Sequence, residues 1–182
     1  MHASNRRSRA FGAAVAAIIM AAVVLTPQAA NAYSLTGCHW PASGGKVTWE
    51  NDAPAGSYYN SGTAAGYSWA NATDVNDMSP THGLMVGFTD NKGANGYDGW
   101  TDWNCLGSTT TFANVTLNPY YTNSFSTVKR QAIWTHELGH GLGLNHSGSS
   151  AAIMYHCPAC VYNTYGYYYP RPDDVAGMNT LY

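Results

Sequence analysis

Charged side chains are scarce in this chain: Asp, Glu, Lys and Arg together make up 10% of its 182 residues. Three of the eight basic residues are Arg6, Arg7 and Arg9, so they lie in the first ten positions. Residues 33–182 keep five basic and ten acidic side chains, a formal net charge of −5. Without a basic patch or stripe to neutralise a phosphate backbone, nucleic acid is excluded as an expected partner.

Long apolar runs are missing beyond the N-terminal region. Residues 1–10 are basic, 11–25 are apolar, and 26–32 end in the small residues Ala30 and Ala32. This order is typical of a signal peptide, and the apolar run is shorter than the about 20 residues of a membrane span. We therefore expect 1–32 to be a signal peptide, with an uncleaved anchor as the alternative. Residues 33–182 are expected to be one domain, secreted, extracellular and free of the membrane.

Cysteines are few, and their number is even: Cys38, Cys105, Cys157 and Cys160. In an exported chain this predicts two disulfides, with three possible pairings, of which we favour Cys38–Cys105 and Cys157–Cys160. The C-x-x-C spacing could instead be the redox site of an extracellular thiol oxidoreductase. Such a site begins a helix, whereas we predict no helix at 161–166.

The hydrophobic pattern predicts a mixed α/β fold. Alternating apolar residues indicate strands at 46–51, 83–89 and 112–117, and helical spacing indicates helices at 57–72, 126–142 and 172–182. Segment 90–108 shows neither periodicity, so we predict a loop.

The loop predicted at 90–108 is rich in oxygen ligands between Asp90 and Asp102. Glycine-spaced Asp and Asn side chains can bind Ca²⁺, although this segment does not match the EF-hand pattern. A Ca²⁺ site is one interpretation, and a solvated loop is the other.

Nucleophile motifs such as G-x-S-x-G are absent, but one metal-binding motif is present within the predicted helix 126–142. His136 and His140 are four residues apart, so both imidazoles project from one helix face and can bind a single tetrahedral Zn²⁺. Gly143 can end the helix in a left-handed conformation, which lets His146 return to the metal as the third ligand. Three neutral ligands leave an open position for a water of lowered pKa, and Glu137 is placed to accept its proton.

The motif from His136 to His146 resembles the signature of the metzincin clan of zinc peptidases, and within it the matrixin-type catalytic domain. Ser147 follows the third histidine, and Met154, followed by Tyr155, stands where matrixins carry the methionine of their Met-turn. The C-terminal residues 173–182 are similar to the closing helix of that family.

This resemblance implies a twisted, mixed five-stranded sheet over two long helices, with a small C-terminal subdomain that holds the Met-turn and the final helix. It implies that 112–117 is the edge strand on which an extended peptide substrate pairs. Met154 would pack beneath the zinc, and Asp174 would be a buried anchor near the Met-turn. The implied activity is that of a secreted zinc endopeptidase, expected to act as a monomer on protein or peptide substrates.

Five tyrosines lie between the Met-turn and the final helix, Tyr165, Tyr167 and Tyr168 among them. The family resemblance suggests that they wall the pocket for the residue after the cut, which would favour an apolar or aromatic residue. Alternatively they only cover the small subdomain. His39, His82 and His156 have no assigned role, and a non-catalytic zinc-stabilised binding module is the first alternative to an enzyme.

Overall fold

The computed structural model describes residues 31–41, 43–75, 78, 80 and 82–182, so the predicted signal peptide lies almost wholly outside the described residues. The strands are β1 (Ser34–Leu35), β2 (Trp49–Asn51), β3 (Met85–Thr89), β4 (Gly99–Leu106), β5 (Thr109–Leu117) and β6 (Leu144–Asn145). The helices are α1 (Ser57–Ala72), α2 (Pro119–Thr122), α3 (Thr127–Leu142), α4 (Pro158–Tyr165) and α5 (Pro172–Met178), with a 3-10 turn at Ser43–Gly45.

The main sheet has the strand order β2-β3-β5-β4. The first three strands are parallel, and β4 is antiparallel to β5. The sheet is mixed, as predicted, but it has four strands in the described part of the chain instead of five. Beyond β2 lies a single parallel bridge between Trp49 and Pro80, where proline cannot donate a ladder hydrogen bond.

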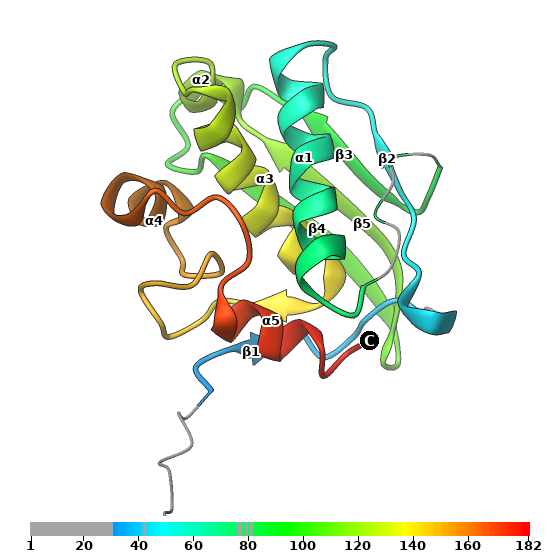
Figure 1. Cartoon of the computed structure of the whole chain (residues 1–182). Coiled ribbons are helices and arrows are strands. Elements are labelled where there is room, and N and C mark those ends of the chain that lie inside the picture. The colour runs from blue at the N-terminus through cyan, green and yellow to red at the C-terminus, as the bar shows by residue number, and fades with distance from the viewer. Residues whose placement is uncertain (1–30, 42, 76–77, 79, 81) are drawn as a thin grey trace, which may run out of the picture.

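The two long helices predicted from the sequence are present, and Figure 1 shows α1 and α3 side by side across one face of the sheet. Between the helices and the sheet lies a core whose largest members, Trp49, Trp69 and Trp134, are fully buried. Helix α3 starts where predicted, because the Ser126 hydroxyl accepts a hydrogen bond from the Lys129 N–H as an N-cap.

Segment 90–108 is not all loop, because β4 occupies Gly99–Leu106 and forms the edge of the sheet. Its side chains become exposed from Asp102 onwards, so it lacks the apolar alternation of a half-buried strand. The prediction of 112–117 as the edge strand is therefore wrong: β5 is paired on both sides, by β3 and by β4.

The C-terminal part forms a small subdomain of β6, a turn around Met154, and α4 and α5, and the last helix ends at Met178, short of the predicted 182. The sequence prediction also missed α4. Pro158 stands in its first turn and the left-handed Gly166 ends it, a combination that outweighs the weak helix propensity of its β-branched and aromatic residues.

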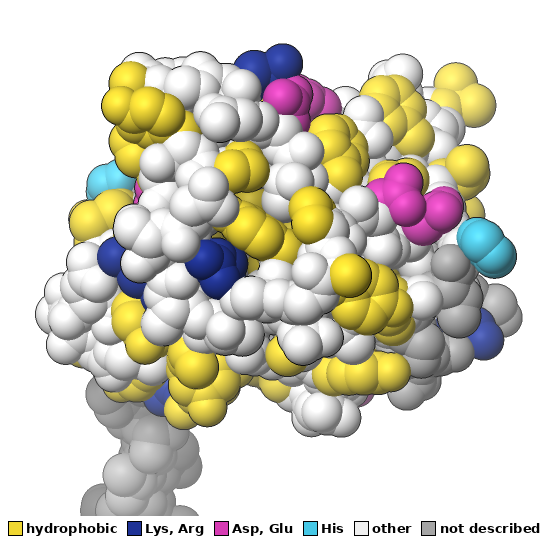
Figure 2. All heavy atoms as spheres, turned by 90° about the horizontal axis from the view of Figure 1, so that it is seen from above, with side chains coloured by type: hydrophobic (Ala, Val, Ile, Leu, Met, Phe, Trp, Pro, Cys, Tyr) yellow, Lys and Arg dark blue, Asp and Glu magenta, His cyan; other side chains and the backbone are white. Residues whose placement is uncertain are grey.

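Both favoured disulfides are formed. Cys38–Cys105 joins the N-terminal segment to β4, and Cys157–Cys160 encloses the first turn of α4. Among the described residues, no helix is long and apolar enough to cross a membrane. The face seen in Figure 2 carries few charged side chains among uncharged polar and hydrophobic groups, as the composition predicts.

Candidate metal centre

Two of the three predicted ligands lie on α3, one turn apart. His136 and His140 are buried, and their Nε2 atoms lie 3.1 Å from each other. The Nδ1 atom of His136 lies 2.8 Å from the Ile153 carbonyl oxygen, and that of His140 lies 2.8 Å from the Leu144 carbonyl oxygen. Because a carbonyl can only accept, each Nδ1 carries the proton and each neutral ring is left with its lone pair on Nε2.

Two lone pairs that face each other at 3.1 Å repel unless a positive group lies between them. Tetrahedral Zn²⁺ with Zn–N bonds of about 2.0–2.1 Å places its ligand atoms roughly 3.3 Å apart, so the spacing suits this metal. The carbonyl groups of Ile153 and Leu144 orient the two rings in the way that outer hydrogen bonds orient metal-binding histidines.

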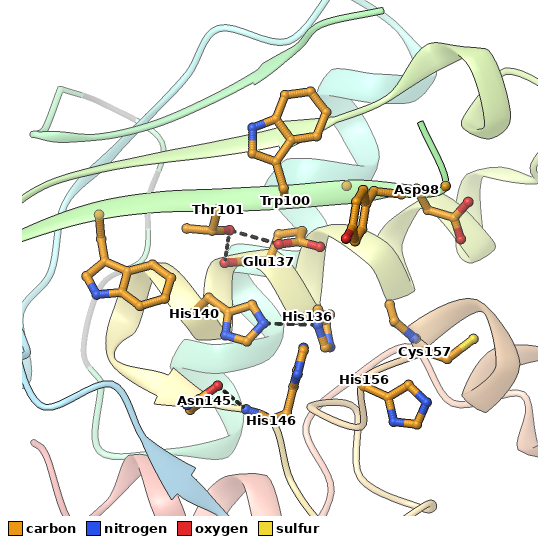
Figure 3. Close-up of a pocket in the computed structure, with 15 residues that line it drawn as sticks. Asp98, Trp100, Thr101, His136, Glu137, His140, Asn145, His146, His156 and Cys157 are labelled. Atoms are coloured by element: carbon orange, nitrogen blue, oxygen red, sulfur yellow. Dashed lines mark hydrogen bonds between the residues drawn. The ribbon is translucent and has the colours of Figure 1, made fainter. Parts of the chain in front are cut away.

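The third predicted ligand, His146, is brought near the other two by the turn after α3. Gly143 has a φ of 116°, and the chain then enters β6, which pairs with β1. The ring of His146 lies 5.3 Å from that of His136 and 4.9 Å from that of His140, centroid to centroid. One ligand atom of each ring lies within 4.8 Å of the others, and Figure 3 shows the three rings turned toward one another.

Burial favours the neutral form of these imidazoles, most strongly at the buried His136 and His140 and less at the exposed His146. It lowers the pKa of His136 well below its usual value, that of His140 to about 4, and that of His146 also below its usual value. Neutral imidazole is the form that binds metal. The residues present therefore fit a zinc ion on three grounds: ligand type, spacing and protonation.

Glu137 lies beside the histidines in a cavity of about 340 Å³, and burial raises its pKa to about 8. Its Oε2 accepts a hydrogen bond of 2.9 Å from the hydroxyl of Thr101 on β4. The cavity is open to solvent and is lined by β4, the three histidines and the segment after the Met-turn. The arrangement thus holds a buried carboxyl group next to a candidate cation site in a space that a substrate can enter.

The Met-turn lies beneath this site, as the family resemblance implies. Met154 is buried against Gly139 of α3, where the absence of a side chain leaves room for its sulfur. Asp174 is fully buried and accepts hydrogen bonds from the backbone N–H groups of Ile153, Met154 and Arg171. It therefore fixes the turn whose Ile153 carbonyl orients His136.

The three pocket tyrosines predicted from the sequence do not line this cavity. Tyr165 stacks on Tyr167, the Arg171 guanidinium lies 4.0 Å from the Tyr167 ring, and Tyr168 packs against the core. The start of α4, at Cys157 and Pro158, lines the cavity, whereas the tyrosines follow from the C-terminal end of that helix onwards. The alternative, that these tyrosines cover the subdomain, agrees better with this placement.

Several cavity residues were missed by the sequence prediction. They come from β4 and the segment just before it, and from the chain directly after the Met-turn: Asp98, Trp100, Thr101, Trp103, His156, Cys157 and Pro158. Their place in the cavity wall is visible only in the three-dimensional structure, since β4 was predicted as loop. His156 lines the cavity, whereas His39 contacts Tyr182 and His82 lies near Glu50.

The predicted Ca²⁺ loop forms no group of three carboxylates. Across the described residues, the three histidines are the one cluster of His, Cys, Asp or Glu side chains close enough to hold an ion together. Loop 91–97 is instead tied to buried Asn118, whose amide nitrogen contacts oxygens of Gly93, Asn95 and Tyr97.

Fold and site together define a zinc peptidase domain of the metzincin type. The chain belongs to the matrixin family, whose model matches residues 65–182.

Human matrix metalloproteinase-20 is 41% identical over 78 residues, which cover 42% of this chain and 15% of that protein. Human matrix metalloproteinase-19 is 46% identical over 56 residues, 30% of this chain and 10% of that protein. Human matrix metalloproteinase-26 is 43% identical over 53 residues, which cover 26% of this chain and 18% of that protein. The matched segments span less than a fifth of each relative.

Proposed function

We propose that this chain is a secreted zinc endopeptidase in which His136, His140 and His146 bind the metal and Glu137 is the general base. One observation carries the proposal: two imidazole lone pairs converge at 3.1 Å in an open cavity that also holds a buried glutamate. A structural zinc site is usually closed by four protein ligands, whereas the described cluster offers three, which favours catalysis over a zinc-stabilised binding module.

The residues divide the reaction between them. Zinc, when bound, supplies a Lewis acid that polarises the scissile carbonyl and acidifies a water. Glu137 accepts a proton from the attacking water and passes it to the leaving amine. Positive charge beside Glu137 lowers its pKa again, so the carboxylate that accepts protons belongs to the metal-loaded protein.

The substrate would be a protein or peptide in extended form. β4 is an edge strand, and it carries Gly99, Thr101 and Trp103 into the wall of the cavity. A sheet edge offers unpaired backbone groups to which an extended peptide can add as a further strand. This replaces the role first predicted for 112–117.

Secretion is supported by the basic and apolar pattern of residues 1–32 and by the two disulfides. Both cysteines of the C-x-x-C sequence are paired with each other, and no free cysteine is present among the described residues. The pair also lies at the start of helix α4. The sequence prediction that no helix follows these cysteines, which spoke against a redox site, is therefore wrong.

The proposal is tested by metal removal and return. A zinc chelator should abolish cleavage of fluorescent casein, and added Zn²⁺ should restore it, because the three histidines hold the ion that the chemistry needs. The Glu137→Gln variant should retain zinc and fold but lose at least about 10²-fold in kcat, the scale of a general base.

Glu50→Gln is the matched control, because Glu50 lies on β2 away from the cavity and is the other glutamate of the chain. It should keep normal activity. Full activity in a demonstrably metal-free sample, or normal turnover by Glu137→Gln, would contradict the proposal.

A further inference from the structure

The side chain of Glu137 has a single hydrogen-bond partner among the described residues, and that partner is not on its own helix. The Thr101 hydroxyl lies 2.9 Å from Oε2 of Glu137 and 2.9 Å from the backbone carbonyl oxygen of the same residue. No contact of this kind holds Oε1. One carboxylate oxygen is therefore tied to the sheet, and the other is free for a ligand in the cavity (Figure 3).

The strand that supplies this hydroxyl is shaped to receive the glutamate. Thr101 is paired with Val115 in the β4–β5 ladder, which fixes its position relative to α3. Gly99 lies two residues earlier, on the same face of β4. A Cβ atom there would lie 3.0 Å from Cγ and 3.1 Å from Oε1 of Glu137, so the missing side chain leaves the space that the carboxylate occupies.

A hydroxyl is suited to hold this group throughout proton transfer. It donates to Oε2 of the carboxylate, and once Oε1 has taken a proton, Oε2 is a carbonyl oxygen that can still accept from it. Both acceptors lie at the same distance from the Thr101 oxygen. The contact can therefore persist whether or not Glu137 carries a proton.

We infer that Thr101 is a positioning residue for Glu137: its hydroxyl anchors Oε2 to the edge strand and leaves Oε1 directed to the reacting water. The inference rests on the proposed function. It also links substrate binding to the base, because the strand on which an extended peptide would pair carries the hydroxyl that orients Glu137.

The test compares Thr101→Val, which keeps the shape but removes the hydroxyl, with Thr101→Ser, which keeps the hydroxyl. Zinc content, thermal unfolding, kcat and KM are measured on a fluorogenic peptide that spans a cleavage site mapped in casein. Thr101→Val should lower kcat by about tenfold or more, the equivalent of one hydrogen bond to a charged group, with KM and zinc content unchanged. Thr101→Ser should restore kcat to within about threefold of the wild type.

Thr111→Val is the matched control, since Thr111 lies on β5, its hydroxyl donates to the Asn104 carbonyl, and it does not line the cavity. Thr101→Val should also add no further loss in the Glu137→Gln background, because a residue that acts through Glu137 has nothing left to position. An additive loss in that background, an unchanged kcat in Thr101→Val, or failure of serine to rescue it would overturn the inference. If Thr101→Val misfolds, the kcat of Thr101→Ser, which keeps the hydroxyl, decides whether the inference stands. A wild-type protein that binds zinc but cleaves nothing refutes the proposed function and this inference together.

Discussion

Asp174 shows how much one buried carboxylate does for this site. It has no exposed surface, and three backbone N–H groups donate to its two oxygens. Burial nonetheless raises its pKa to about 6. Its three accepted hydrogen bonds hold the Met-turn against the N-terminus of α5.

We expect Asp174→Asn to destabilise the protein by about 1–3 kcal/mol, because the amide turns donors toward donors and leaves a buried N–H without a partner. The free energy of unfolding from denaturant titration measures the loss. Asp102→Asn, the same change at an exposed position of β4, should stay within about 0.5 kcal/mol of the wild type. Equal stability of the two variants would show that Asp174 does not hold the turn.

The sequence predicted those site residues that lie close together along the chain. His136, Glu137, His140 and His146 fall within one helix and the turn after it, so spacing alone assembles them. Thr101 could not be found in this way, because its contact with Glu137 depends on β4 packing beside α3. Local periodicity contains no information about such a long-range contact.

The end of α3 is the element on which the third ligand depends. Gly143 has a φ of 116°, and a Cβ atom there would lie 2.7 Å from the Cys38 carbonyl oxygen and 3.0 Å from Cδ1 of Leu181. We expect Gly143→Ala to lower the free energy of unfolding by about 2 kcal/mol or more, from backbone strain and this collision together. Zinc affinity should also fall, since the turn delivers His146.

Gly166→Ala provides the comparison. Gly166 also ends a helix with a positive φ, of 70°, but a Cβ atom there would meet nothing within 4 Å. Its cost should be about 1 kcal/mol, with unchanged zinc affinity. Isothermal titration with Zn²⁺ and thermal unfolding separate the two variants, and a similar loss of affinity in both would refute the steric argument.

Strands and helices were predictable where burial imposes a period. α1 coincides with the predicted 57–72, because one of its faces packs into the core. β4 and α4 were missed because the first is an exposed edge strand and the second is short and held by its neighbours. Both line the candidate site or adjoin it, so the least predictable elements are the ones that shape the cleft.

The two disulfides close loops of very different length in the chain. Cys38 and Cys105 are separated by 67 residues, and Cys157 and Cys160 by 3. The entropy of loop closure in the unfolded chain assigns roughly 4 kcal/mol to the first and roughly 2 kcal/mol to the second. We expect Cys38→Ser/Cys105→Ser to lose clearly more stability than Cys157→Ser/Cys160→Ser in denaturant titrations. The reverse order would contradict the prediction.

The metal-free protein should lose stability at both ends of the pH scale. The folded pKa of Glu137, about 8, lies above its ordinary value of 4.5, so its stabilising contribution is present at low pH and is lost as pH rises through 8. The three ligand histidines have lowered folded pKa values, so their contribution is lost as pH falls below about 6.5.

From about pH 7.5 to about pH 9, the Glu137 effect amounts to roughly 0.8 kcal/mol. Thermal unfolding of chelator-treated protein across this range should therefore show a small decline in the wild type. The Glu137→Gln variant, which cannot titrate there, should show a flatter profile. Parallel profiles for the two proteins would mean that Glu137 does not titrate in this range.

The pairing of β1 with β6 brings two segments that are far apart in the chain together next to the third histidine. Ser34 pairs with Asn145 and Leu35 with Leu144, directly before His146, and contacts between such distant segments are slow to form. Under the proposed function, a chain still in transit has two ligands on a nascent helix but no completed hydrolytic centre. Completion of the hydrolytic centre, under the proposed function, therefore depends on a contact between distant segments of the chain.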